Sequence, residues 1–225
     1  MITRKATVLS FLILLSGMCI VIAGDDGPLL PPQSSFRGTS FEKWNVLWSE
    51  RTIESNLAAA IQVPETLNNV RMLPSFVTPG SFEFDVTVPP GTGFVTCPFF
   101  VYGEHYDDPT VPDDTHQLIV DLQLFDTVEI EVILDGQVLL DGTGTDLDHW
   151  YFGPTYFDNP IVYAEPQFRF NNENGDPVNA VEALFVEGIG TLYHPLPPGQ
   201  HTLVQNISSP FFGDFHYVYH INVSN

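Results

Sequence analysis

Apolar and polar residues alternate along much of the second half of the chain, with the period of two that half-buried strands show. Asp135 and Gly136 lie between two alternating runs and predict a two-residue hairpin turn with positive backbone dihedrals. Short strands separated by proline and glycine turns predict a mainly β fold, an antiparallel β-sandwich of jelly-roll-like type. The alternating runs are "FEFDVTV" (82–88), "VEIEVILDGQVLL" (128–140), "HTLVQNI" (201–207) and "FHYVYHINV" (215–223).

One segment, residues 39–60, repeats at helical spacing instead and predicts a single N-terminal α-helix. Phe41, Trp44 and Trp48 recur every three or four residues, and Thr39 with Glu42 fits a capping box. This aromatic face is expected to dock on the core; a ligand-binding face is the alternative. The helix and strands predict one domain over residues 39–225.

The prolines of residues 25–38 resist helix formation, and this stretch is predicted to be a flexible linker. Before it, residues 1–24 fit a signal peptide, since a basic start is followed by an apolar run and small residues. A membrane anchor is the competing interpretation, but the acidic, proline-rich continuation favours cleavage. We therefore expect a secreted, extracellular protein, with the periplasm as an alternative location. Cys97 would then be the only cysteine, and an ordinary buried thiol is expected.

The charge balance excludes some partners. The chain has 28 acidic residues, seven Lys and Arg together, and a formal net charge of −21. Such a surface repels nucleic acid and anionic membranes, so we expect neither as a partner, and no membrane span after signal cleavage. A carbohydrate or cationic partner is compatible with it, and solubility is its simplest purpose.

An acid-rich segment, residues 103–116, is predicted to be a loop that follows a strand, where binding sites usually lie. Carboxylate oxygens suit calcium, which makes a calcium ion the candidate cofactor. A transition-metal site using His105 and His116 with Glu104 is an alternative, and a solvated acidic loop is the simplest one. The candidate metal ligands are Glu104, Asp107, Asp108, Asp113 and Asp114.

A second candidate region is the predicted loop of residues 142–158. For an enzyme that acts on polysaccharide, a hydrolase or a lyase, the candidate catalytic residues are Glu104, Asp146, Asp148 and His149. For a binding protein, the candidate ligand-stacking residues are Trp150, Tyr151 and Tyr156. In a third interpretation these aromatics simply fill the core. Because nucleophile-elbow, metalloprotease and phosphate-loop motifs are absent from the sequence, we favour a non-enzymatic extracellular binding or surface protein.

Residues 195–201, "PLPPGQH", predict a corner between a strand that ends near Tyr193 and another that begins at His201. Two prolines pre-set the backbone and a glycine permits the reversal. Glycosylation sequons occur at Asn206 and Asn222, and they matter only in a eukaryotic source.

Five ordered motifs resemble those of a family of bacterial secreted proteins of unknown function. The resemblance covers nearly all of the chain after the signal and implies export and a shared architecture, with no activity attached. The chain departs from the family by having Lys43 where a glutamate is usual and by lacking cysteines after the central segment. The matching motifs are "GTSFEKWNVLW" (38–48), "VPPGTGFVTCPF" (88–99), "LDGQVL" (134–139), "PLPPGQHTL" (195–203) and "FHYVYHINV" (215–223).

Overall fold

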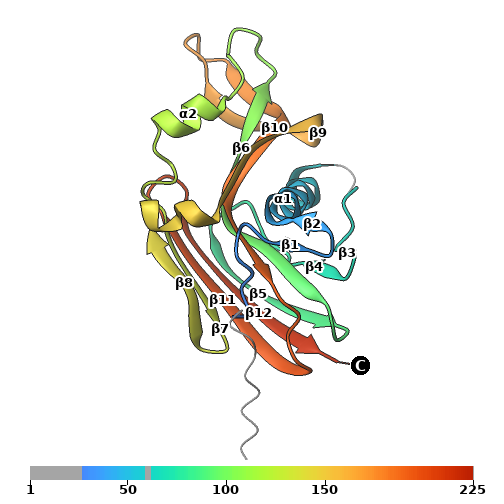
Figure 1. The fold of residues 1–225 in the computed structure, drawn as a ribbon. Coiled ribbons are helices and arrows are strands. Elements are labelled where there is room, and N and C mark those ends of the chain that lie inside the picture. The colour runs from blue at the N-terminus through green and yellow to red at the C-terminus, as the bar shows by residue number, and fades with distance from the viewer. Residues whose placement is uncertain (1–26, 59–61, 225) are drawn as a thin grey trace, which may run out of the picture.

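The structure, a computed structural model, describes residues 27–58 and 62–224, and it is mainly β, as the alternating patterns predict (Figure 1). One five-stranded sheet has the order β3 (Thr66–Leu67), β4 (Val70–Met72), β6 (Gly93–Tyr106), β10 (Pro177–Tyr193), β9 (Tyr151–Asn171). The other has the order β5 (Gly80–Val88), β12 (Gly213–Val223), β11 (Gly199–Ser209), β7 (Glu129–Leu134), β8 (Gln137–Thr143). A small additional pair is β1 (Ser35–Phe36) with β2 (Thr39–Ser40). None of the described helices is long and apolar enough to span a bilayer.

The two large sheets pack against each other around the main hydrophobic core. Inward-facing residues of β6 and β10 meet those of β5, β7, β11 and β12 there. The β7–β8 hairpin turns at Asp135 and Gly136 with φ angles of 51° and 80°, which confirms the predicted turn. Most neighbours are antiparallel, but β5 pairs with β12 and β4 pairs with β6 in parallel, so the sheets are not wholly antiparallel as expected.

Helix α1 (Phe41–Leu57) covers the face of the first sheet that points away from the second (Figure 1). Trp44 and Trp48 are fully buried against that sheet, which confirms that the aromatic face docks on the core. The predicted capping box is wrong by one residue. The Ser40 hydroxyl caps the helix by accepting from the Lys43 backbone N–H, while the Glu42 carboxylate accepts from Thr155 on β9.

The stretch predicted to be a flexible linker is packed instead, over its described part from Gly27 to Gly38. Leu30 is buried, and its backbone N–H donates to Leu192 on β10. Pro28 accepts from the backbone N–H of His194. Proline excludes a helix here, but it does not prevent an extended chain from lying along a sheet.

Three connections complete the fold: α2 (His116–Asp121), the 3-10 helix η1 (Gly144–Trp150) and the corner between β10 and β11. The corner is confirmed, since β10 ends at Tyr193 and β11 begins at Gly199. His201 holds it by contacts to the Asp135 carboxylate at 2.7 Å and to the Pro197 carbonyl at 2.9 Å. The histidine of this motif therefore has a structural role.

Candidate functional site: a cleft along the free edge of β6

Strand β6 has one edge that its neighbours leave open. On one side it pairs with β10 along most of its length. On the other side β4 pairs only with Gly93–Val95, and the Leu73 N–H adds one more bond to Val95. Further along this edge, both backbone groups of Glu104 bond to Asp114: the Asp114 N–H donates to the Glu104 carbonyl, and the Glu104 N–H donates to the Asp114 side-chain carboxylate. Between these points no described strand pairs with this edge.

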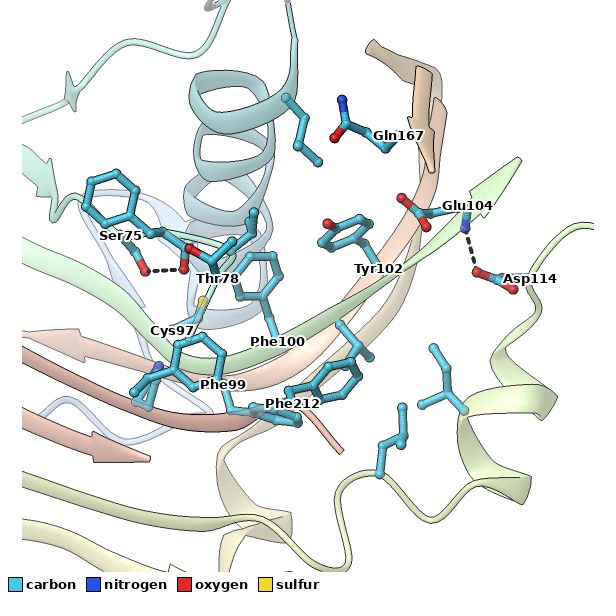
Figure 2. Close-up of a pocket in the computed structure, with 18 of the residues that line it drawn as sticks. Ser75, Thr78, Cys97, Phe99, Phe100, Tyr102, Glu104, Asp114, Gln167 and Phe212 are labelled. Carbon is cyan, nitrogen blue, oxygen red and sulfur yellow. Dashed lines mark hydrogen bonds between the residues drawn. The ribbon is translucent and has the colours of Figure 1, made fainter. Parts of the chain in front are cut away.

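A cleft of about 540 Å³, here called the β6 cleft, lies along this open edge (Figure 2). Six consecutive residues, Cys97 to Tyr102, line it. Successive strand residues point to opposite faces of a sheet, so a cleft that contacts all six must wrap around the strand edge. Indeed Phe99 and Val101 belong to the core between the sheets, whereas Phe100 packs on the α1 side. The remaining apolar walls come from residues 75–78, from Leu57 of α1, from α2 with the segment after it as far as Leu124, and from residues 212–217 at the start of β12.

The cleft is rimmed by exposed apolar side chains. Phe76, Leu118, Leu122 and Phe212 line it, and each is more than 40% exposed. Large exposed hydrophobic groups that gather around a concavity are typical of binding sites rather than of plain surface. Cys97 lies at the base, where it is 3% exposed, as the sequence predicts, and burial raises the pKa of its thiol.

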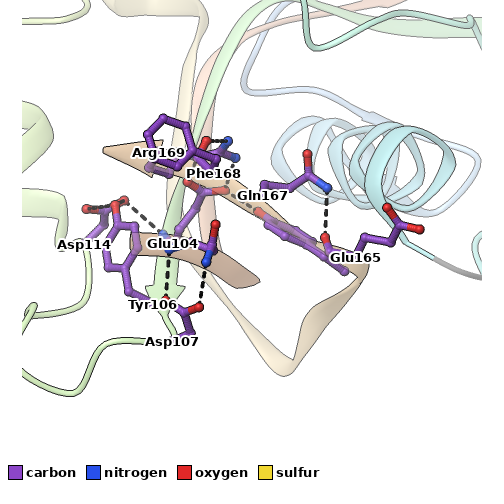
Figure 3. Close-up of polar contacts among 10 residues, drawn as sticks. Glu104, Tyr106, Asp107, Asp114, Glu165, Gln167, Phe168 and Arg169 are labelled. Carbon is purple, nitrogen blue, oxygen red and sulfur yellow. Dashed lines mark hydrogen bonds and ion pairs between the residues drawn. The ribbon is translucent and has the colours of Figure 1, made fainter. Parts of the chain in front are cut away.

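One end of the cleft is polar and is built around the Glu104 carboxylate (Figure 3). The Arg169 guanidinium on β9 donates to both Glu104 oxygens, from Nε and from Nη2, each at 2.6 Å. The Tyr163 hydroxyl donates a third bond at 2.6 Å. The bonds to Glu104 raise the pKa of Arg169 and outweigh its partial burial, so the guanidinium stays charged beside the carboxylate.

Asp114 and Tyr102 complete the polar end. Burial raises the pKa of the Asp114 carboxyl, although hydrogen bonds from Glu104 and Tyr106 act in the opposite direction. Burial, reinforced by the charge of Glu104, raises the pKa of Tyr102 to about 12. Because Arg169 compensates the charge of Glu104, Asp114 is the carboxyl at this end that forms no ion pair within the described residues.

The structure changes the interpretation of the acid-rich segment. Glu104 and His105 belong to strand β6 and not to a loop, because the strand continues to Tyr106. The loop carboxylates beyond it have protein partners. Asp107 accepts from the backbone and side-chain N–H groups of Asn179, and these bonds lower its pKa. Asp108 accepts from the side chain of Asn172, and this hydrogen bond lowers the pKa of Asp108.

The histidines of this segment do not meet. His105 contacts Asp113 at 2.6 Å, and this bond raises its pKa. His116 lies at the start of α2, where its Nδ1 is about 3 Å from both oxygens of Glu187 on β10. Over residues 27–58 and 62–224 there is no group of three or more His, Cys, Asp or Glu side chains that could hold a metal ion. Glu104 and Asp114 lie side by side at one end of the cleft, but the candidate calcium ligands and the alternative transition-metal ligands do not come together as one metal-binding group in this part of the chain.

The second candidate region is not a loop either, since η1 and β9 occupy it. Asp146, Asp148 and His149 are exposed on η1, and none of them lines the β6 cleft beside Glu104. Trp150 and Tyr151 pack partly against the hydrophobic core, as the core-filling interpretation expects. Of the proposed stacking residues only Tyr156 is largely exposed, and it lies against Phe185 at a centroid distance of 4.9 Å.

Two features of the site escaped the sequence reasoning. Arg169 is the only Lys or Arg after Arg71, which is a signal that a lone cation has a specific partner. Glu187 stands within an apolar run and proves to be fully buried, bonded to His116 and to the Tyr151 hydroxyl. An acid inside an apolar strand predicts such a buried polar contact.

Comparison of the chain with models of known protein families and with curated proteins found no match. What the structure defines is a mainly β protein with an aromatic cleft at an open strand edge.

Proposed function

We propose that this protein is a secreted, non-enzymatic binding protein whose ligand places an apolar part in the β6 cleft. The observation that carries the proposal is the cleft itself: a large concavity with aromatic and aliphatic walls and a few polar groups at one end, the usual composition of ligand sites. The proposal depends on the cleft and not on the jelly-roll topology that the sequence suggests, which stays a prediction.

Catalysis is less well supported by this geometry. Glu104, one of the two carboxyl groups that line the cleft, is held by Arg169 and Tyr163, so its oxygens are occupied and its charge is compensated. The other candidate acids of the polysaccharide hypothesis, Asp146 and Asp148, are exposed on η1 and do not line the cleft. Paired carboxylates that cleave glycosides must instead face each other across the bond they attack.

The export part of the proposal rests on the sequence of residues 1–24, which lie outside the described residues. The net charge of −21 favours a ligand that is neutral or cationic over an anionic one. The polar end of the cleft supports the same choice, because Asp114 adds a carboxyl to an already neutralised ion pair.

The test uses Nile red, a neutral apolar dye, titrated into the purified chain and followed by fluorescence. Leu118→Asp places a charge at the rim of the cleft and should weaken dye binding at least tenfold. Val120→Asp is the matched control, since Val120 is equally exposed on the same helix but does not line the cleft. Phe212→Asp and its neighbour Phe211→Asp form a second pair with the same logic. Absence of dye binding, or equal losses within both pairs, would refute the proposal.

A further inference from the structure

The backbone of β6 offers unused hydrogen-bonding groups to the cleft. A strand residue directs its N–H and C=O to the same side, and the side alternates along the strand. Glu104 directs both groups to the open edge, where Asp114 binds them. The pairing with β10 advances one residue at a time on β6 from Phe99 to Glu104. One irregularity lies opposite Glu104 and Gly103, but its extra residue is on β10, between Ala183 and Phe185, so the alternation along β6 itself is kept. Tyr102 and Phe100 therefore also direct N–H and C=O to the open edge.

These backbone groups face a largely apolar cleft. Unpaired N–H and C=O groups are costly when water is displaced from them, so an apolar ligand alone would leave them unsatisfied. A ligand with its own backbone donors and acceptors would satisfy both at once. Its side chains would alternate between the two lobes of the cleft, one lined by Phe99 and Val101 and the other by Phe100 and Tyr102.

We propose that the ligand of the β6 cleft is an extended polypeptide segment that adds as a strand to the open edge of β6 beside Phe100 and Tyr102. This inference rests on the proposed binding function and specifies its partner. Strand addition of this kind draws its affinity from main-chain bonds and its specificity from alternate side-chain pockets.

The chemistry of the cleft also defines the segment. The open edge is bounded by Pro98, which has no N–H, and by Asp114 at Glu104, so about four or five residues of the partner fit along it. These residues are apolar, since both lobes are. A lysine or arginine follows at the polar end, where the Asp114 carboxyl lines the cleft.

The probe is a fluorescein-labelled peptide, Lys-Lys-Val-Leu-Val-Leu-Lys-Lys, together with versions in which Phe or Ile replaces Leu, measured by fluorescence anisotropy with the full chain. Two methylated forms of the tightest peptide serve as controls. Methylation of alternate backbone nitrogens leaves one strand edge free and should be tolerated within about threefold. Methylation of all four central nitrogens removes the backbone N–H donors from both edges of the peptide and should weaken binding at least tenfold, although it makes the peptide more apolar.

A matched pair of variants tests the protein side. Tyr102→Pro removes the side chain and the outward N–H, whereas Tyr102→Ala removes the side chain alone. Because this N–H faces away from β10, the substitution by proline leaves that ladder intact. The Pro variant should bind the peptide at least tenfold more weakly than the Ala variant, while both bind Nile red equally. Should circular dichroism show that the Pro variant is unfolded, the methylated peptides decide the question on the unchanged chain.

The outcomes separate the two proposals. Dye binding in the cleft without binding of any peptide overturns strand addition and leaves the binding function standing. Equal affinity for the unmethylated and fully methylated peptides, or binding to phosphatidylcholine vesicles with none to peptides, also overturns strand addition. Failure of both the dye and the peptides removes both proposals.

Discussion

Substitution of Arg169 by leucine should expose how strongly the polar end of the cleft depends on one ion pair. The Glu104 side chain is 7% exposed and carries its charge because three donors surround it, two of them on Arg169. In Arg169→Leu only the Tyr163 hydroxyl remains, and a buried carboxylate is left without a counter-charge.

The size of the effect follows from burial. Removing one partner of a buried pair typically costs about 3–5 kcal/mol, mainly because the other charge stays buried. Since the Arg169 side chain is 31% exposed, water reaches the site and we expect a smaller loss than this, about 2–3 kcal/mol. Glu104→Gln should cost less, about 1 kcal/mol, because the guanidinium it leaves behind is the more exposed partner and can still donate to the amide oxygen of Gln.

Urea unfolding followed by tryptophan fluorescence measures these free energies, since Trp44 and Trp48 are fully buried in the folded chain. In a double-mutant cycle the Glu104→Gln/Arg169→Leu variant should be more stable than the sum of the single losses by at least about 1 kcal/mol. A loss below about 0.5 kcal/mol for Arg169→Leu, or strict additivity in the cycle, would refute the argument that the carboxylate is buried and charged.

Three further outcomes are expected. His201→Gln should destabilise the protein most below about pH 6.5 and less as the pH rises, because hydrogen bonds to Asp135 and a carbonyl outweigh burial and raise the folded-state pKa of this histidine. Melting temperatures of the variant and the unchanged protein, compared across pH 5.5–8.5, test this, and a difference that widens with rising pH would contradict it. Gly103→Ala should lose about 1–3 kcal/mol in urea unfolding, since a Cβ there would overlap the ring of Phe185, and a neutral result would show that the ring moves aside. Millimolar calcium should leave the melting temperature where EDTA leaves it; a calcium-specific rise that magnesium does not reproduce would point to a site that the described residues do not form.

The parts of the fold that the sequence predicts are those governed by local chemistry. The pleat of a strand explains the alternation of apolar and polar residues along β7 and β12, and backbone dihedrals explain the Asp135–Gly136 turn. The structure has both strands and the turn. The prolines of residues 27–38 exclude a helical conformation, but they do not determine whether Leu30 is buried against β10, as it is in the structure. Burial of an irregular segment depends on a partner about 160 residues away, which no local pattern contains.

The site escaped prediction for the same reason. Strand β6 is covered on both faces, so its apolar residues form an almost continuous run and do not alternate with polar ones. The sequence therefore predicts that the acidic residue near its end, Glu104, belongs to a loop. Glu104 stays in the strand because Arg169, 65 residues further along, neutralises it. No pattern of residue spacing in the sequence predicts that Glu104 and Arg169 pair, although the chain has few cationic residues that could be the partner of Glu104.

The open edge itself has a cause in the sequence. Strand β4 ends at Met72, and the next residue, Leu73, makes the last backbone hydrogen bond to β6. Pro74 follows and has no N–H with which to continue the ladder. Hydroxyls of two β12 tyrosines hold the departing chain on the second sheet by donating to the carbonyls of Pro74 and Phe76. Natural sheets normally shield such edges, because a long one invites uncontrolled pairing between chains. Here the exposed stretch is kept short, so the geometry suits the addition of one short strand better than open-ended association.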